Sequence, residues 1–254
     1  MEIIFVGTGS GRTSLERFHS SICFKDEKKS ILIDVGDGIS KALLSQNIEY
    51  NSITEIIISH YHSDHFSGLP SLLTQMIIED RKTPFKIYTH EKLINPLQNF
   101  LYTTSIFLEN LKFGVEIIGF NFVKEVFLND TIKFSAKQNS HITNKHNIEL
   151  EKAHFISSSF LFHLGNKKLV YTSDIGNYDD LFLFQDTKAD IFIAESTHIP
   201  LSRIEDAITI LDPHKVILTH IDDKKEINNW FNKMSDGKKD KILIARDGMQ
   251  IILE

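Results

Sequence analysis

The segment from residue 60 to residue 65 concentrates side chains that bind metal ions, and it reads His60-Tyr61-His62-Ser63-Asp64-His65. It follows the apolar run 55–59, whose isoleucines predict a buried strand. Residues two apart at a strand end project to the same side, so His60 and His62 can meet one ion, while the following turn redirects Asp64 and His65. Imidazole and carboxylate together suit first-row divalent ions. The segment therefore predicts two metal ions, with zinc expected and manganese or iron as alternatives.

Apolar runs of strand length occur along the whole chain, and they must position these ligands. Further strands are expected at 2–6, 21–25, 31–34, 85–88, 132–136, 157–164, 168–173, 191–194, 215–218 and 250–253. Helical patterns fall at 40–45, 69–79, 91–111, 202–211 and 224–233. This order predicts an α/β fold with two mixed sheets flanked by helices. No linker or internal repeat is evident, so a single domain over 1–254 is expected, with a partly helical insertion at about 91–125.

The composition is that of a globular protein with a core of its own. The 254 residues are 41% apolar and 24% charged, and the net charge of -6 argues against wholesale attraction to nucleic acid without excluding a local basic patch. Cys23 is the only cysteine, which fits a reducing compartment and a buried thiol. With no signal-like or membrane-length apolar segment, a cytoplasmic protein with no membrane contact is expected.

The metal-binding segment resembles the signature of the metallo-β-lactamase superfamily, His-x-His-x-Asp-His after a buried strand. The likeness extends to the glycine-rich stretches 7–11 and 33–38 and to Ala245-Arg-Asp-Gly248. The glycines of 7–11 could also belong to a dinucleotide-binding loop, but the helix and acidic residue expected after such a loop are not evident. The resemblance implies the four-layer αββα sandwich of this superfamily. It also implies that Asp64 orients the attacking water.

The resemblance supplies further ligands at later strand ends. Val170-Tyr-Thr-Ser-Asp174 and Val216-Ile-Leu-Thr-His220 are similar to family motifs, which implies that Asp174 bridges the two ions and that His220 joins Asp64 and His65 at the second one. The remaining ligand of the first ion is one of His141, His146 and His154. His141 is favoured because it closely follows the strand 132–136, whereas His154 fits better if the spacing to the next hairpin decides.

Glu195 and His198 lie in Ala194-Glu-Ser-Thr-His198, again at the end of an apolar run. They could support the metal ligands or donate a proton to the leaving group. Phosphodiesterase branches of the superfamily carry a similar acidic motif at this place. A strand-terminal glutamate with a surface histidine is the alternative interpretation.

The chain is most similar to ribonuclease Z and related phosphodiesterases, which implies a hydrolase in which hydroxide held by two cations attacks a phosphodiester. Residues 80–130 show no glycine-rich basic arm of the kind that grips transfer RNA. We therefore expect a small-molecule or nucleotide phosphodiester as substrate, a cyclic nucleotide among them, in preference to RNA. The sequence does not decide whether the protein forms a homodimer. Two alternatives from other classes are a di-iron oxidoreductase on the same ligands and a non-catalytic, metal-stabilised binding protein.

Overall fold

The computed structural model describes residues 1–27, 29–143 and 154–253. The chain folds into two compact units, one of residues 1–121 with 246–254 and one of residues 122–245. Each unit contains one seven-stranded mixed sheet, as predicted from the strand pattern. The organisation as a single domain remains a prediction.

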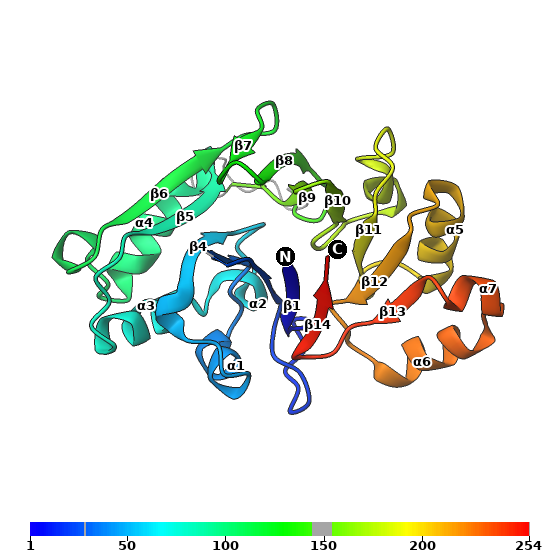
Figure 1. Cartoon of the computed structure of the whole chain (residues 1–254), viewed down its shortest axis with the longest axis horizontal. Helices are drawn as coiled ribbons and strands as arrows, with labels where there is room; N and C mark the ends of the chain where they lie inside the picture. The colour runs from blue at the N-terminus through cyan, green and yellow to red at the C-terminus, as the bar shows by residue number, and fades with distance from the viewer. Residues whose placement is uncertain (28, 144–153, 254) are drawn as a thin grey trace. The chain divides into compact units, whose positions relative to one another are not determined.

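The sheet of the first unit has the strand order β14-β1-β2-β3-β4-β5-β6 (Figure 1). Pairings among β14, β1, β2 and β3 are antiparallel, and those among β3, β4, β5 and β6 are parallel. The strands are β1 (Glu2–Gly7), β2 (Ser21–Lys25), β3 (Ser30–Ile33), β4 (Ile53–Ile57), β5 (Phe85–His90), β6 (Val115–Phe120) and β14 (Met249–Ile252). Because neighbouring parallel strands end at the same edge, the loops after β3, β4 and β5 leave the sheet side by side.

One face of this sheet is covered by helices. They are α1 (Ile39–Ser45), α3 (Leu69–Ile78) and α4 (Ile94–Thr103), with the one-turn helix α2 (Ser63–Phe66) and the 3-10 turns η1 (Tyr50–Ser52), η2 (Glu91–Leu93) and η3 (Leu108–Asn110). Leu43 of α1, Leu73 of α3 and Leu97 of α4 share one buried cluster with Leu32 and Ile56 of the strands. Alternate strand residues face the helices, as the period of two requires.

The sheet of the second unit has the order β13-β12-β11-β10-β9-β8-β7, with parallel pairing from β13 to β10 and antiparallel pairing from β10 to β7. Its strands are β7 (Val126–Phe127), β8 (Ile132–Gln138), β9 (Ser158–Leu164), β10 (Lys167–Tyr171), β11 (Ile191–Glu195), β12 (Lys215–Thr219) and β13 (Ile242–Ile244). The hairpin β9–β10 turns at Gly165, which takes a φ of 63° as a two-residue turn needs. The loops after β10, β11 and β12 thus share one edge.

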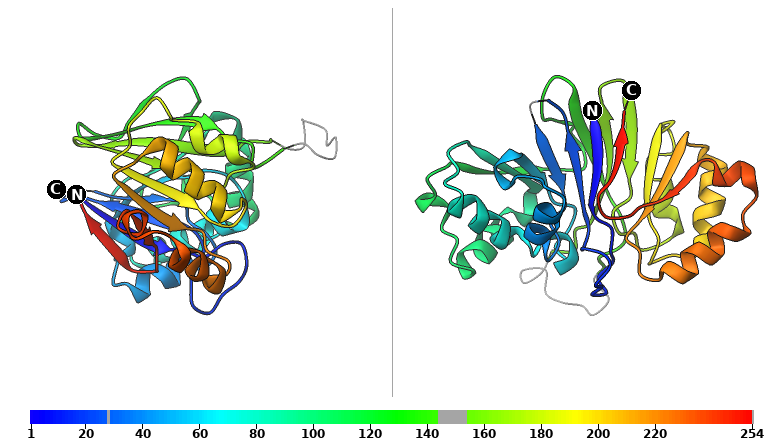
Figure 2. Two further views of the ribbon diagram at one scale, coloured as in Figure 1. Left: turned by 90° about the vertical axis from the view of Figure 1, so that its right-hand side faces the viewer. Right: turned by 60° about the horizontal axis from the view of Figure 1, so that its bottom comes forward.

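Helices also cover this second sheet, and Figure 2 shows α5 lying across its strands. They are η4 (Tyr178–Phe182), α5 (Leu201–Leu211), α6 (Lys224–Lys233) and α7 (Asp236–Lys239). Ile204 of α5 and Ile227 of α6 are buried with Phe192, Val216 and Leu218 of the strands. Asp223 caps α6 by accepting hydrogen bonds from the amides of Lys225 and Glu226, which explains why the helix begins there.

One predicted helix boundary is wrong, and one strand near it was missed. The helix predicted at 91–111 is shorter, because α4 ends at Thr103 and Ser105 takes a φ of 62°, a left-handed conformation that a helix cannot continue through. The strand β6 was not predicted, and it lies within the segment expected as a partly helical insertion at about 91–125. In the described part of the chain, no helix has the length and apolarity needed to cross a membrane.

Candidate metal centre

The segment 60–65 leaves the carboxyl end of β4 and continues directly into α2. His60 and His65 are fully buried, Asp64 is 5% exposed and His62 is exposed. The ring centroid of His60 lies 4.8 Å from that of His62 and 4.2 Å from that of His65. Nε2 of His65 lies 3.6 Å from Oδ2 of Asp64. The four predicted ligands of the first unit therefore gather within one loop, as the strand-end argument expects.

Asp34, at the end of the neighbouring strand β3, orients two of these histidines. Its Oδ2 lies 2.8 Å from Nδ1 of His65, and its two oxygens accept hydrogen bonds from the amide and hydroxyl of Ser59. The Ser59 hydroxyl in turn lies 3.0 Å from Nδ1 of His60. A carboxylate bound to Nδ1 leaves Nε2 of His65 to face a metal ion, which is the usual arrangement around metal-binding histidines.

Two glycines let the loops of this half of the site approach closely. A Cβ on Gly36 would lie 2.1 Å from the carbonyl oxygen of Asp64, and a Cβ on Gly68 would lie 2.2 Å from that of Gly36. Tyr61 fixes the same loop, since its ring stacks on Phe66 with centroids 4.6 Å apart and its hydroxyl donates to the carbonyl of Leu93. Burial raises the pKa of the Tyr61 phenol, so this hydroxyl stays protonated.

The glycine-rich loop after β1 lies beside Asp64, because a Cβ on Gly11 would be 3.3 Å from its Oδ2. Asp247, in the turn before β14, holds this loop in place. It accepts hydrogen bonds from the amides of Thr8 and Phe18 at 2.9 and 2.6 Å. Arg17 donates to the hydroxyl of Thr8. Burial lowers the pKa of Arg17, with Asp247 opposing the shift.

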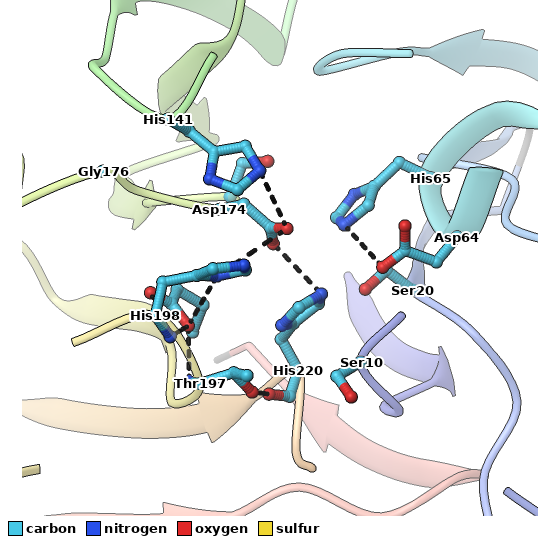
Figure 3. A network of polar contacts seen from close by, with 12 residues as sticks. Ser10, Ser20, Asp64, His65, His141, Asp174, Gly176, Thr197, His198 and His220 are labelled. Atoms are coloured by element: carbon cyan, nitrogen blue, oxygen red, sulfur yellow. Dashed lines mark hydrogen bonds and ion pairs between the residues drawn. The ribbon is translucent and has the colours of Figure 1, made fainter. Parts of the chain in front are cut away.

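In the second unit, Asp174 lies between two histidines (Figure 3). Its Oδ2 lies 3.5 Å from Nε2 of His141, and its Oδ1 lies 3.3 Å from Nε2 of His220. Asp174 and His220 are each 2% exposed. The two oxygens of one buried carboxylate thus face different imidazole nitrogens.

Glu195 and His198 adjoin this group. The Glu195 carboxylate accepts hydrogen bonds from the amides of Thr197 and His198, at 2.6 and 3.0 Å. Nδ1 of His198 lies 3.5 Å from Oε2 of Glu195 and 3.9 Å from Oδ2 of Asp174. Glu195 is 1% exposed, whereas the His198 side chain is 34% exposed. The ligand atoms of Glu195, His198 and His220 all lie within 4.8 Å of one another.

Another buried carboxylate, Asp180, holds the loop that carries His141. It accepts hydrogen bonds from the Ser140 hydroxyl at 2.7 Å, from the Ser140 amide at 3.1 Å and from the Gly176 amide at 2.9 Å. The two loops are in close contact, because a Cβ on Gly176 would lie 2.2 Å from the Ser140 carbonyl oxygen. Asn139 completes the support by accepting a hydrogen bond from the His141 amide.

Three non-glycine residues at these strand ends have positive φ angles. They are Asp34 with 62°, Ser173 with 53° and His220 with 54°. Such conformations are uncommon outside glycine, and they concentrate where a side chain must be aimed by its surroundings. Here each follows a strand and either carries or adjoins a candidate ligand.

The donor sets of both units fit a metal ion. Ligand atoms about 2.0–2.1 Å from a tetrahedral ion lie roughly 3.3–3.4 Å apart, which is longer than a charged hydrogen bond of about 2.7–2.9 Å. Three of the histidine–aspartate pairs, His220–Asp174, His141–Asp174 and His65–Asp64, have separations of 3.3, 3.5 and 3.6 Å, which match the longer spacing. The residues are also of the right kind, since imidazole and carboxylate bind zinc and its first-row neighbours.

Among the three histidines considered for the remaining ligand, His141 lies beside Asp174, whereas His154 is exposed and His146 lies outside the described residues. The sequence did not indicate Asp34, Asp180 and Asn139 as supporting residues, although Asp34 stands in the glycine-rich stretch 33–38 that carried the family likeness. Cys23 is fully buried as expected, and burial raises the pKa of its thiol to about 12.

A family model described as "Anti-Pycsar protein Apyc1" matches residues 1–233. The chain belongs to this family. Among curated relatives, it is 32% identical to ribonuclease Z of Methanococcus aeolicus over 136 residues, which are 54% of this chain and 41% of that enzyme. The chain thus matches less than half the length of that relative, and only a third of the length of ribonuclease Z of Pyrococcus abyssi.

Solved structures share the fold over the whole chain. The metallo-β-lactamase fold protein YhfI from Bacillus subtilis has a TM-score of 0.76 at 18% identity, covering 98% of each chain. The short form of human tRNase Z has a TM-score of 0.72 at 20% identity, covering 100% of each. The predicted metallo-β-lactamase fold is therefore confirmed, and the predicted similarity to ribonuclease Z is found over part of that enzyme's length.

Proposed function

We propose that this member of the Apyc1 family is a metallo-hydrolase of small-molecule or nucleotide phosphodiesters, and that the predicted ligands hold two divalent ions. The observation that carries the proposal is Asp174, whose two oxygens each face a different histidine as a bridging carboxylate requires. His60, His62 and His141 would hold one ion together with Asp174. Asp64, His65 and His220 would hold the other with the same carboxylate.

Phosphodiester chemistry is supported by the relatives. The curated relatives are named ribonuclease Z, so their named substrate is RNA. This chain carries the strand-end ligand segment 60–65 and the acidic motif at Glu195. We expect a small diester or nucleotide as substrate, because the sequence lacks an evident basic arm for transfer RNA.

When bound, two cations supply a water of lowered pKa and polarise the phosphoryl oxygen. The protein's own groups do the remaining work. Asp64, on a loop fixed by Tyr61 and the two glycines, would orient the attacking water. Glu195, held by two backbone amides, faces Nδ1 of His198 and favours a proton on that nitrogen. His198 is accessible enough to pass a proton to the departing oxygen.

The deciding experiment measures hydrolysis by chelated and metal-reloaded protein. The substrates are bis(p-nitrophenyl) phosphate, 3′,5′-cyclic nucleotides, precursor transfer RNA, a β-lactam and a thioester. We expect turnover of the small diesters that disappears on chelation and returns with zinc, manganese or iron. Activity on the lactam or thioester alone would overturn the reaction class, and oxygen consumption by an iron-loaded, red protein would favour the oxidoreductase. Efficient cleavage of the transfer RNA precursor with little small-diester turnover would change the substrate while leaving the metal chemistry in place.

A further inference from the structure

A polar hollow of about 310 Å³ lies within the second unit, next to the candidate catalytic pair. Its walls come from the segment before α5, from the turn after β12 and from the first turn of α6. His198 lines it, and the same side chain lies 3.5 Å from Glu195. The hollow therefore lies directly beside His198, the proposed proton donor.

Carboxylates dominate the charged groups that line this hollow. Asp222, Asp223 and Glu226 contribute from one short stretch, and all three are exposed. Asp223 also accepts hydrogen bonds from the amides of Lys225 and Glu226, so the N–H groups at the start of α6 are already engaged. Lys224 and Lys225 begin the same helix, but neither is among the residues that line the hollow.

Buried apolar side chains also line the hollow. Ile199, Ile221 and Ile227 line it and are 7%, 4% and 2% exposed. Apolar side chains together with carboxylate acceptors suit an organic group that carries hydroxyl and amine donors. The volume is near the lower end of the range for small-molecule sites, about 300–1,000 Å³, and suits one nucleoside-sized group.

We propose that this hollow is a selectivity subsite: it binds the donor-bearing organic part of a mononucleotide diester and disfavours polyanions. The proposal rests on the proposed function, since it gives the hollow the part of the substrate attached to the reacting phosphate. Asp222 and Glu226 accept hydrogen bonds from hydroxyl and amine groups. Additional phosphates, as in RNA, would meet three carboxylates and lose affinity through repulsion between like charges.

The test uses the double variant Asp222→Asn with Glu226→Gln in the full chain. Binding of adenosine, an uncharged nucleoside, is measured by calorimetry, and kinetics are measured with 3′,5′-cyclic AMP and bis(p-nitrophenyl) phosphate. A hydrogen bond to a charged group contributes about 1.5–3 kcal/mol. We therefore expect at least about tenfold weaker adenosine binding and a similar rise in KM for cyclic AMP. The KM for bis(p-nitrophenyl) phosphate, which has no donors, should not rise, and a single-stranded RNA oligonucleotide should bind the variant more tightly.

The matched control is Glu49→Gln with Asp206→Asn, which removes the same charge from exposed positions that do not line the hollow. If adenosine affinity and KM changed equally in the control and test variants, net charge alone would explain the effect, and the subsite would be overturned. Absent adenosine binding, or binding that the test variant leaves unchanged, would overturn it as well. Because adenosine binding needs no turnover, wild-type protein that hydrolyses no diester would refute the proposed function while the calorimetry still decides the subsite.

Discussion

Individual side chains at this site are aimed by buried carboxylates that need not touch a metal ion. Asp34 illustrates this, because its contacts with His65 and Ser59 leave Nε2 of His65 to face an ion. Asp174 has the more demanding role, since its two oxygens face His141 and His220. The proposed roles therefore predict different consequences for different single substitutions.

Replacing Asp174 with alanine should remove both ions, because this carboxylate is the proposed bridge. Replacing His60 should mainly empty one site, and replacing Glu195 with glutamine should leave metal content nearly intact while lowering activity by about 10–100-fold. Elemental analysis and diester turnover of the three purified variants check this order. Equal metal loss from Asp174→Ala and His60→Ala would contradict the bridging role.

At the scale of elements, the site depends on loops that leave the carboxyl ends of parallel strands. In the second unit, the loops after β10, β11 and β12 carry Asp174, Glu195 and His220, while His141 follows the antiparallel strand β8. The His141 loop therefore needs a support of its own. Asp180 provides it by bonding to Ser140 and to Gly176.

We expect Asp180→Asn to weaken metal binding by about 10–100-fold, because an amide cannot accept all the hydrogen bonds of the carboxylate. His141→Ala should reduce metal content at least as strongly, whereas His154→Ala, at an exposed position, should be silent. Metal titration monitored by calorimetry compares these variants, with Asp179→Asn as the control at the exposed neighbouring position. A silent His141→Ala beside a damaging His154→Ala would reverse the ligand assignment.

At the scale of the whole molecule, each unit carries its own sheet and its own share of the predicted ligands. The chain passes from the first unit to the second and returns to the first only with β14, which pairs with β1. His60, His62, Asp64 and His65 belong to the first unit, whereas His141, Asp174 and His220 belong to the second. If these residues bind metal ions as proposed, metal binding should stabilise the folded protein.

Free metal at about 100 times its dissociation constant should stabilise the folded protein by about 2.7 kcal/mol, if the unfolded chain does not bind it. We expect chelation to lower Tm in differential scanning calorimetry. Asp64→Ala in the first unit and His220→Ala in the second should each abolish most of the metal-dependent increase. If one of the two variants keeps the full increase, the residue replaced in it does not hold the ion that stabilises the protein.

The local sequence determined most of the strands and the positions of several candidate ligands. The apolar runs predicted all but three of the described strands, the missed ones being β6, β7 and β13. The residues 60–65 form a predictable cluster because they are adjacent in the chain and leave one strand end. Asp174, Glu195 and His220 could be placed at strand ends for the same reason, although their roles came from the family resemblance.

Only the tertiary structure decided which distant groups meet. His141 could not be separated from His146 and His154 by spacing, and its contact with Asp174 joins residues 33 positions apart. Asp34 bonds to His65 and Asp180 bonds to Ser140 across similar separations, and no local pattern encodes such pairings. The orientation of the Asp174 carboxylate and the positive φ of His220 also depend on surrounding packing. The periodicity of the sequence indicates which residues are buried. Hydrogen bonds between residues at different strand ends depend instead on which strands pair in the fold.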